Sequence, residues 1–113
     1  MIVADMASAL REANIIATYL EFAARRYSEA QSSPRVEPYL DGYRYYQSAL
    51  LRFSDKRGVI ASEDSAAARA IADALALFGQ AYRAPSRPPT LTADPVALNA
   101  AAARVRAAAD GMV

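Results

Sequence analysis

The sequence contains no cysteine, no histidine and no tryptophan among its 113 residues. Without cysteine, disulfide bonds and thiolate metal sites are excluded. Without histidine, the chain lacks the commonest general base and the commonest metal ligand. Its four glycines are scattered along the chain, so no glycine-rich phosphate loop is present. We therefore expect no catalytic residue, no cofactor and no metal ion.

An excess of charge of one sign is also missing, since 13 basic and 12 acidic residues give a net charge of +1. Non-specific binding of nucleic acid requires a basic surface, and this balance argues against it. The only lysine, Lys56, lies between Asp55 and Arg57 near a predicted helix end, where it is solvated and not held in a catalytic pocket. We expect a protein that is not an enzyme and has no small-molecule substrate.

Long apolar runs are absent as well. No stretch approaches the roughly 20 apolar residues that a membrane-spanning helix needs. The first residues, MIVADMAS, include an acid at position 5 and do not resemble a targeting segment. We expect a cytoplasmic protein, or one incorporated into a particle assembled in the cytoplasm, without a membrane partner.

What the sequence does contain is helical periodicity, with apolar residues spaced three and four apart and no sustained alternation. This pattern predicts an all-α fold: a single-domain bundle of three main helices plus a C-terminal helix after a Pro-rich linker. We place the three-helix core at 1–83, the linker at 84–93 and the C-terminal helix at 94–113. The C-terminal helix docks either on its own core or on a neighbouring chain.

The first predicted helix, over residues 5–31, carries two apolar faces. Its main stripe consists of Met6, Leu10, Ala13, Ala17, Leu20, Ala24 and Tyr27. A second apolar set lies on the opposite side and is bordered by arginines: Ile15, Tyr19 and Phe22, with Arg11, Arg25 and Arg26. A helix with two apolar faces is either sandwiched within its own fold or uses one face on another chain.

The second predicted helix begins near Pro38 and ends at the sequence DKRG, where Gly58 is expected to adopt the left-handed conformation that caps a helix. We assign its core stripe to Tyr39, Tyr43, Tyr46, Leu50 and Phe53. Three further residues lie off that stripe and are predicted to form a second contact surface: Leu40, Tyr45 and Leu51. The carboxylates of this helix recur among arginines and are typical of a solvated face.

The third predicted helix starts at SEDS, with Ser62 as the N-cap and Glu63 and Asp64 in the first turn, and ends before residue 83. Its expected stripe is Ala67, Ile71, Leu75 (or Ala74), Phe78 and Tyr82. The fourth is expected to have Asp94 as its cap, Pro95 at its first position and Gly111 as its stop. Its few large apolar residues are Leu98, Val105 and Met112, so it would be marginal alone and needs a docking site.

Two functional hypotheses fit these observations. The first is a non-enzymatic structural subunit that packs into a larger homo- or hetero-oligomeric assembly, such as a viral-particle, connector or secretion-apparatus component. The alternative is a small regulatory binder, such as an antitoxin, an inhibitor or a DNA-binding repressor, that uses the arginine and aromatic face of the first helix. Protein is favoured over nucleic acid as the partner, because three glutamates share that helix and arginine is common at protein interfaces. The predicted partner-binding residues are Arg11, Ile15, Tyr19, Phe22, Arg25, Arg26, Leu40, Tyr45, Leu51, Leu98, Val105 and Met112.

Overall fold

The computed structural model describes residues 2–31, 37–81 and 95–112. Over these residues the chain forms four helices and no strand, which confirms the all-α prediction. The helices are α1 (Ile2–Gln31), α2 (Glu37–Glu63), α3 (Ser65–Ala81) and α4 (Pro95–Asp110). The predicted linker at 84–93, the Asp94 cap and Tyr82 lie outside the described residues.

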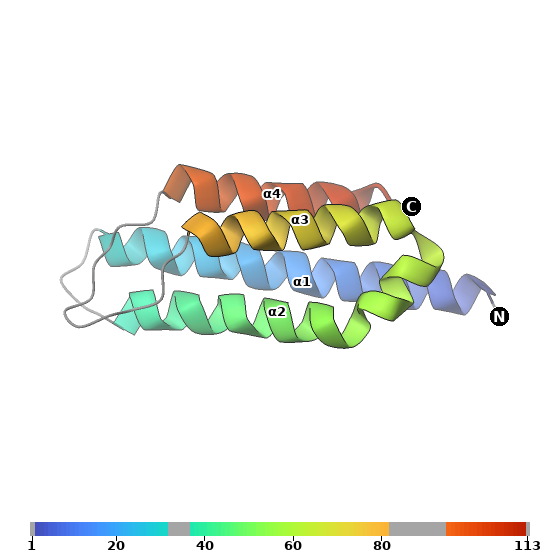
Figure 1. The fold of residues 1–113 in the computed structure, drawn as a ribbon. Helices are drawn as coiled ribbons and strands as arrows, with labels where there is room; N and C mark the ends of the chain where they lie inside the picture. The colour runs from blue at the N-terminus through green and yellow to red at the C-terminus, as the bar shows by residue number, and fades with distance from the viewer. Residues whose placement is uncertain (1, 32–36, 82–94, 113) are drawn as a thin grey trace.

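The four helices run antiparallel in chain order and form an elongated bundle (Figure 1). Helix α1 packs against α2 and α4, and α3 packs against the same two helices. The bundle measures 51 × 20 × 17 Å along its principal axes. This is the up-down-up-down arrangement that neighbouring antiparallel helices commonly adopt.

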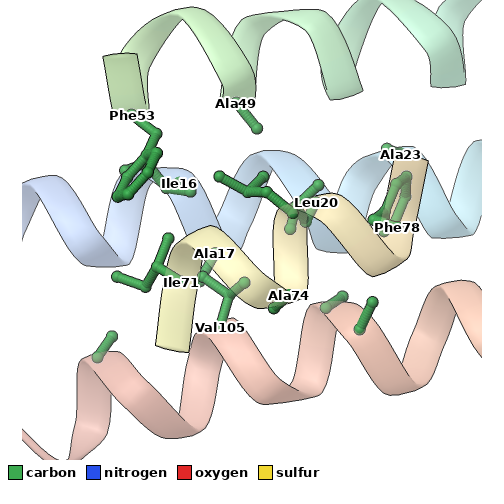
Figure 2. Packing of buried hydrophobic residues seen from close by; sticks show 14 of the residues in the cluster. Ile16, Ala17, Leu20, Ala23, Ala49, Phe53, Ile71, Ala74, Phe78 and Val105 are labelled. Carbon is green, nitrogen blue, oxygen red and sulfur yellow. The ribbon is translucent and has the colours of Figure 1, made fainter. Parts of the chain in front are cut away.

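The core is rich in alanine, because six alanines of α1 between residues 7 and 30 are completely buried. Small side chains let neighbouring helices approach closely, and larger residues fill the layers between them. Figure 2 shows side chains from all four helices in the space between them, and they belong to one buried cluster: Ile16 and Leu20 of α1, Phe53 of α2, Ile71 of α3 and Val105 of α4. The predicted stripe of α1 is confirmed from Ala13 to Tyr27, but Leu10 is only half-buried and the surroundings of Met6 lie outside the described residues. The prediction omitted four fully buried residues of this helix: Ala9, Ile16, Ala23 and Ala30.

The predicted core stripe of α2 is wrong at one position, which is exposed, and two other positions are less buried than predicted. Tyr39 and Phe53 are buried, but Leu50 is 38% exposed. Tyr43 and Tyr46 are only half-buried. The stripe is rotated because the contact is centred on small residues, so that the larger side chains flank it: the buried residues of α2 are Pro38, Tyr39, Gly42, Ala49, Phe53 and Ile60.

The predicted end of α2 at Gly58 is also wrong. The helix continues through that exposed glycine to Glu63, so Lys56 and Arg57 do not lie in its last turn. Glycine inside a helix costs about 0.5–1 kcal/mol. Complete burial of Ile60 stabilises the extension by about 1.5–3 kcal/mol, which outweighs that cost.

The N-cap of α3 is Asp64 and not Ser62. The Asp64 carboxylate accepts a hydrogen bond from the backbone N–H of Ala67 at 2.9 Å, which is the capping geometry. The Ser62 hydroxyl instead donates to the carbonyl oxygen of Val59 within α2. Glu63 consequently ends α2, and the first turn of α3 contains no acid.

Helix α4 begins at Pro95 and its regular structure ends at Asp110, so the predicted first residue and the stop at Gly111 are confirmed. The amide N–H of Gly111 donates to the carbonyl oxygen of Ala107 at 3.0 Å, and the chain then turns. Leu98, Val105 and Met112 are all buried within this chain. The helix therefore packs on α1 and α3 through these three side chains and the alanines between them.

Candidate protein interface

An aromatic cluster lies outside the main core, where α1 and α2 meet. The ring of Tyr45 from α2 lies 5.4 Å from the ring of Phe22 and 6.4 Å from that of Tyr19, measured between centroids. These are the separations at which tilted aromatic rings attract one another. The guanidinium of Arg25 lies over the Phe22 ring at 5.6 Å. Since Phe22 is still 38% exposed, the cluster presents an apolar face to its surroundings.

The surface beside this cluster is hollowed along α1. The hollow is lined by one helix: Ala7, Leu10, Arg11, Asn14, Ile15, Thr18 and Tyr19. A second hollow crosses from α1 to α2 and is lined by Tyr19, Asp41, Arg44, Tyr45 and Ser48. Because Tyr19 borders both, the two hollows adjoin. We call the surface formed by Arg11, Ile15, Tyr19, Phe22, Arg25 and Tyr45 the seam patch.

The structure joins two sets of residues that the sequence placed on separate surfaces. Tyr45 was grouped with Leu40 and Leu51, but it packs on Tyr19 and Phe22 of α1. Leu51 is 72% exposed and Leu40 is half-buried. Six residues on an α-helix amount to a rotation of about 600°, which separates positions 45 and 51 by roughly 120° around α2. Tyr45 therefore belongs to the seam patch, and Leu51 lies on a different side of α2.

Arg26 differs from the other two arginines of the predicted face. Its guanidinium binds Glu29 on the next turn and donates to Asp41 of α2 at 2.8 Å. It thus connects α1 to α2. Arg11 and Arg25 form no ion pair with any residue that the structure describes. They are also exposed, so their charges are available at the two ends of the seam patch.

Two further polar contacts fix the helices on either side of the seam patch, and the sequence did not predict them. Glu12, which is 2% exposed, accepts two hydrogen bonds from Arg52 of α2, at 2.9 and 2.5 Å. Arg106 of α4 donates to both carboxylate oxygens of Glu21, at 3.0 and 2.8 Å. Arg106 also reaches the side-chain oxygens of Asn14, at 2.8 Å, and Thr18, at 3.1 Å. Partners separated by 40 to 92 residues leave no local signal in the sequence.

These contacts account for the perturbed acids. The hydrogen bonds from Arg52 lower the pKa of Glu12 below its ordinary value of 4.5, against the opposing effect of burial. Those from Arg106 lower the pKa of Glu21 in the same way. Burial raises the pKa of Tyr46, whose ring stacks on Phe78. Each shift thus has its main cause in a helix-to-helix contact.

The other predicted partner-binding residues lie away from the seam patch. Leu98 and Val105 are fully buried and Met112 is 4% exposed, all three in the core of the same chain. Within the described parts of the chain, no three carboxylates lie together as a group that could hold a metal ion. No helix among the described residues is both long enough and apolar enough to cross a membrane.

No protein-family model, curated protein or solved structure matches this chain. The functional argument consequently depends on the geometry of the seam patch and on the chemistry of its side chains.

Proposed function

We propose that this chain is a non-enzymatic helical subunit that joins a larger protein assembly, and that the seam patch is its contact surface. The observation that carries the proposal is the aromatic cluster of Tyr19, Phe22 and Tyr45 at the outer junction of α1 and α2. Viral-particle, connector and secretion-apparatus subunits are the classes that this description fits.

The composition of the seam patch supports a protein partner. Tyrosine and arginine are enriched among the residues that dominate binding energy at protein interfaces. Aromatic rings bury a large area and lose little conformational entropy on binding. In the seam patch, such rings lie between two exposed arginines. Tyr19 and Tyr45 pack against the core and are only partly buried, and Phe22 is 38% exposed. The exposed parts of the rings are thus available for a contact outside the chain.

A second candidate is the small regulatory binder that acts on nucleic acid. The observation in its favour is the Arg25 guanidinium over the Phe22 ring, because an arginine beside an aromatic ring can contact phosphate while the ring stacks on a base. The net charge of +1 gives no basic field around the patch, and binding of a phosphate backbone depends on such a field, so we rank this candidate second.

The proposal is tested by the mass of the protein in solution and in its source. Native mass spectrometry of the tagged chain from its source cells is expected to reveal species heavier than the 12.1 kDa monomer, and sedimentation velocity at micromolar concentration shows whether the purified chain also associates with itself. A Phe22→Ser, Tyr45→Ser variant is expected to lose them, and Leu51→Ser, on another side of α2, to retain them. A chain that is monomeric in both measurements would contradict the proposal.

A further inference from the structure

We infer that the seam patch receives an acidic amphipathic helix of another protein, one that presents apolar side chains to Ile15, Phe22 and Tyr45 and carboxylates to Arg11 and Arg25. The inference rests on the proposed function and specifies the partner that this surface fits. It takes the helix-in-groove mode, in which anchors repeat at i, i+3 or i+4, and i+7 along the bound helix.

The dimensions of the seam patch suit a helix. Its residues follow α1 from Arg11 to Arg25, which is 14 residues and about 21 Å at 1.5 Å per residue. Tyr45 forms the wall on the α2 side. A partner helix of about four turns, lying along α1, would cover the whole length.

The charges at the two ends define the chemistry of the partner. Arg26, Arg52 and Arg106 are each bound to a carboxylate of this chain. Arg11 and Arg25 are not, and they lie 14 residues apart on the same exposed face, which is about 21 Å. A helix that brings carboxylates to both positions would complete two ion pairs beside an apolar contact, where exclusion of water strengthens them.

A second copy of this chain does not supply that complement. If two seam patches paired antiparallel about the midpoint between Ile15 and Phe22, Arg11 of one copy would lie level with Arg25 and Arg26 of the other. Parallel pairing would oppose each arginine to itself. Like charges face one another in both arrangements, and such juxtaposition disfavours a partner. The pattern therefore points to a different protein.

The experiment uses a display library of peptides about 16 residues long, with apolar residues at the three anchor positions and acidic, basic or neutral residues allowed at the flanks. The library is selected on the full-length chain. The enriched peptides are expected to carry Asp or Glu at both ends, to bind less tightly as salt is raised, and to protect α1 and α2 from hydrogen exchange. An Arg11→Glu, Arg25→Glu variant is expected to bind them at least tenfold more weakly.

The matched control is Arg69→Glu, Arg104→Glu, which reverses two exposed arginines on α3 and α4 that form no ion pair within the described parts of the chain. It is expected to bind the peptides as the unchanged chain does. Circular dichroism on both variants checks that they are folded. Because all four side chains are exposed, both are expected to keep the bundle.

Several results would overturn the inference: enriched peptides without acidic residues, no enrichment, equal loss of binding in the control, or displacement of the peptides by a single-stranded oligonucleotide at low salt. A source complex that survives Arg11→Glu, Arg25→Glu would also overturn it, but would leave the proposed function standing. A chain that is monomeric everywhere would overturn the proposed function, whatever the library returns.

Discussion

Glu12 is a buried carboxylate whose charge depends on a single side chain. Only 3% of its side chain is exposed, and Arg52 satisfies both of its oxygens. Removing one member of a buried ion pair costs far more than replacing both by apolar residues, because the remaining charge is left without water or a partner. Arg52 itself is 38% exposed, so it can be solvated when alone, and Glu12 cannot.

This asymmetry yields a prediction at a single pair of residues. Arg52→Met is expected to lower the free energy of unfolding by about 3 kcal/mol. The double variant Glu12→Leu, Arg52→Met is expected to lie close to the unchanged protein. Urea titration followed by circular dichroism measures both. Arg69→Met, on the exposed side of α3, serves as the control for loss of one positive charge. Equal losses in the single and double variants would contradict the argument.

Gly79 is required by its close approach to Tyr46. A Cβ atom at position 79 would overlap the Tyr46 hydroxyl oxygen and lie 3.2 Å from Cζ. The Tyr46 ring cannot easily move away, because it stacks on Phe78 with a centroid separation of 5.2 Å. At Gly58, by contrast, an added Cβ would meet nothing within 4 Å, and α2 is helical on both sides.

The same change to alanine is therefore expected to act in opposite directions at these two glycines. Gly79→Ala should destabilise the fold by about 1–3 kcal/mol through overpacking. Gly58→Ala should stabilise it by about 0.5–1 kcal/mol through helix propensity. Thermal unfolding measures both. Tyr46→Phe combined with Gly79→Ala is expected to recover part of the loss, since the overlapping oxygen is removed. A stabilising Gly79→Ala would show that the ring moves freely.

Among the helices, α4 depends most on a single polar side chain. Its buried face is largely alanine, so it contributes few large apolar groups. Arg106 compensates by forming hydrogen bonds with Asn14, Thr18 and Glu21 on one side of α1. Hydrogen bonds to charged groups contribute about 1.5–3 kcal/mol, which is comparable with the burial of one large side chain.

Arg106→Gln is accordingly expected to loosen α4 before the rest of the bundle. Native-state hydrogen exchange should reveal faster exchange of α4 amides, with those of α2 little changed. The control is Arg104→Gln, two residues away on the exposed side of the same helix and without an ion pair among the described residues. If both variants exchange alike, Arg106 does not anchor the helix.

The periodicity of single helices predicted the elements well, and the contacts between helices explain the errors. The start of α4 follows from Pro95 and the stripe of α1 from Ala13 to Tyr27 follows from spacing, which are local signals. The end of α2 is decided by where Ile60 is buried, and Asp64 displaces Ser62 as the cap because α2 continues to Glu63. Such choices depend on tertiary packing, which a single helix does not encode.

Part of the seam patch could likewise be predicted from one helix, and part depends on how the helices pack. Arg11, Ile15 and Phe22 lie on one face of α1 by helical geometry alone, and the sequence indicated that face. Tyr45 joins them only because of how α2 is rotated against α1, which the wheel of α2 does not determine. Which arginines form ion pairs is also decided by tertiary contacts: Arg26, Arg52 and Arg106 have carboxylate partners, and Arg11 and Arg25 have none among the described residues.

At the scale of the whole molecule, α1 is the helix to which α2 and α4 are connected by ion pairs. Glu12 is bound by Arg52 of α2, and Glu21 by Arg106 of α4. These arginines hold the pKa of each glutamate below 4.5 in the folded chain. In the unfolded chain the pKa of each glutamate returns to its ordinary value. At a pH between the lowered and the ordinary pKa, the unfolded state therefore binds more protons than the folded state. Their contribution to stability is complete above about pH 4.5 and is lost as pH falls through the lowered values.

The bundle is therefore expected to become less stable in acid chiefly through these two glutamates. Urea midpoints measured from neutral pH down to about pH 3 should fall steeply for the unchanged protein. The Glu12→Gln, Glu21→Gln variant should begin less stable at neutral pH and decline with a shallower slope, so that the two curves converge in acid. Asp55→Asn, Asp73→Asn removes the same two negative charges at exposed positions and should keep the steep slope. Parallel curves for the unchanged protein and the double variant would mean that other carboxylates govern unfolding in acid.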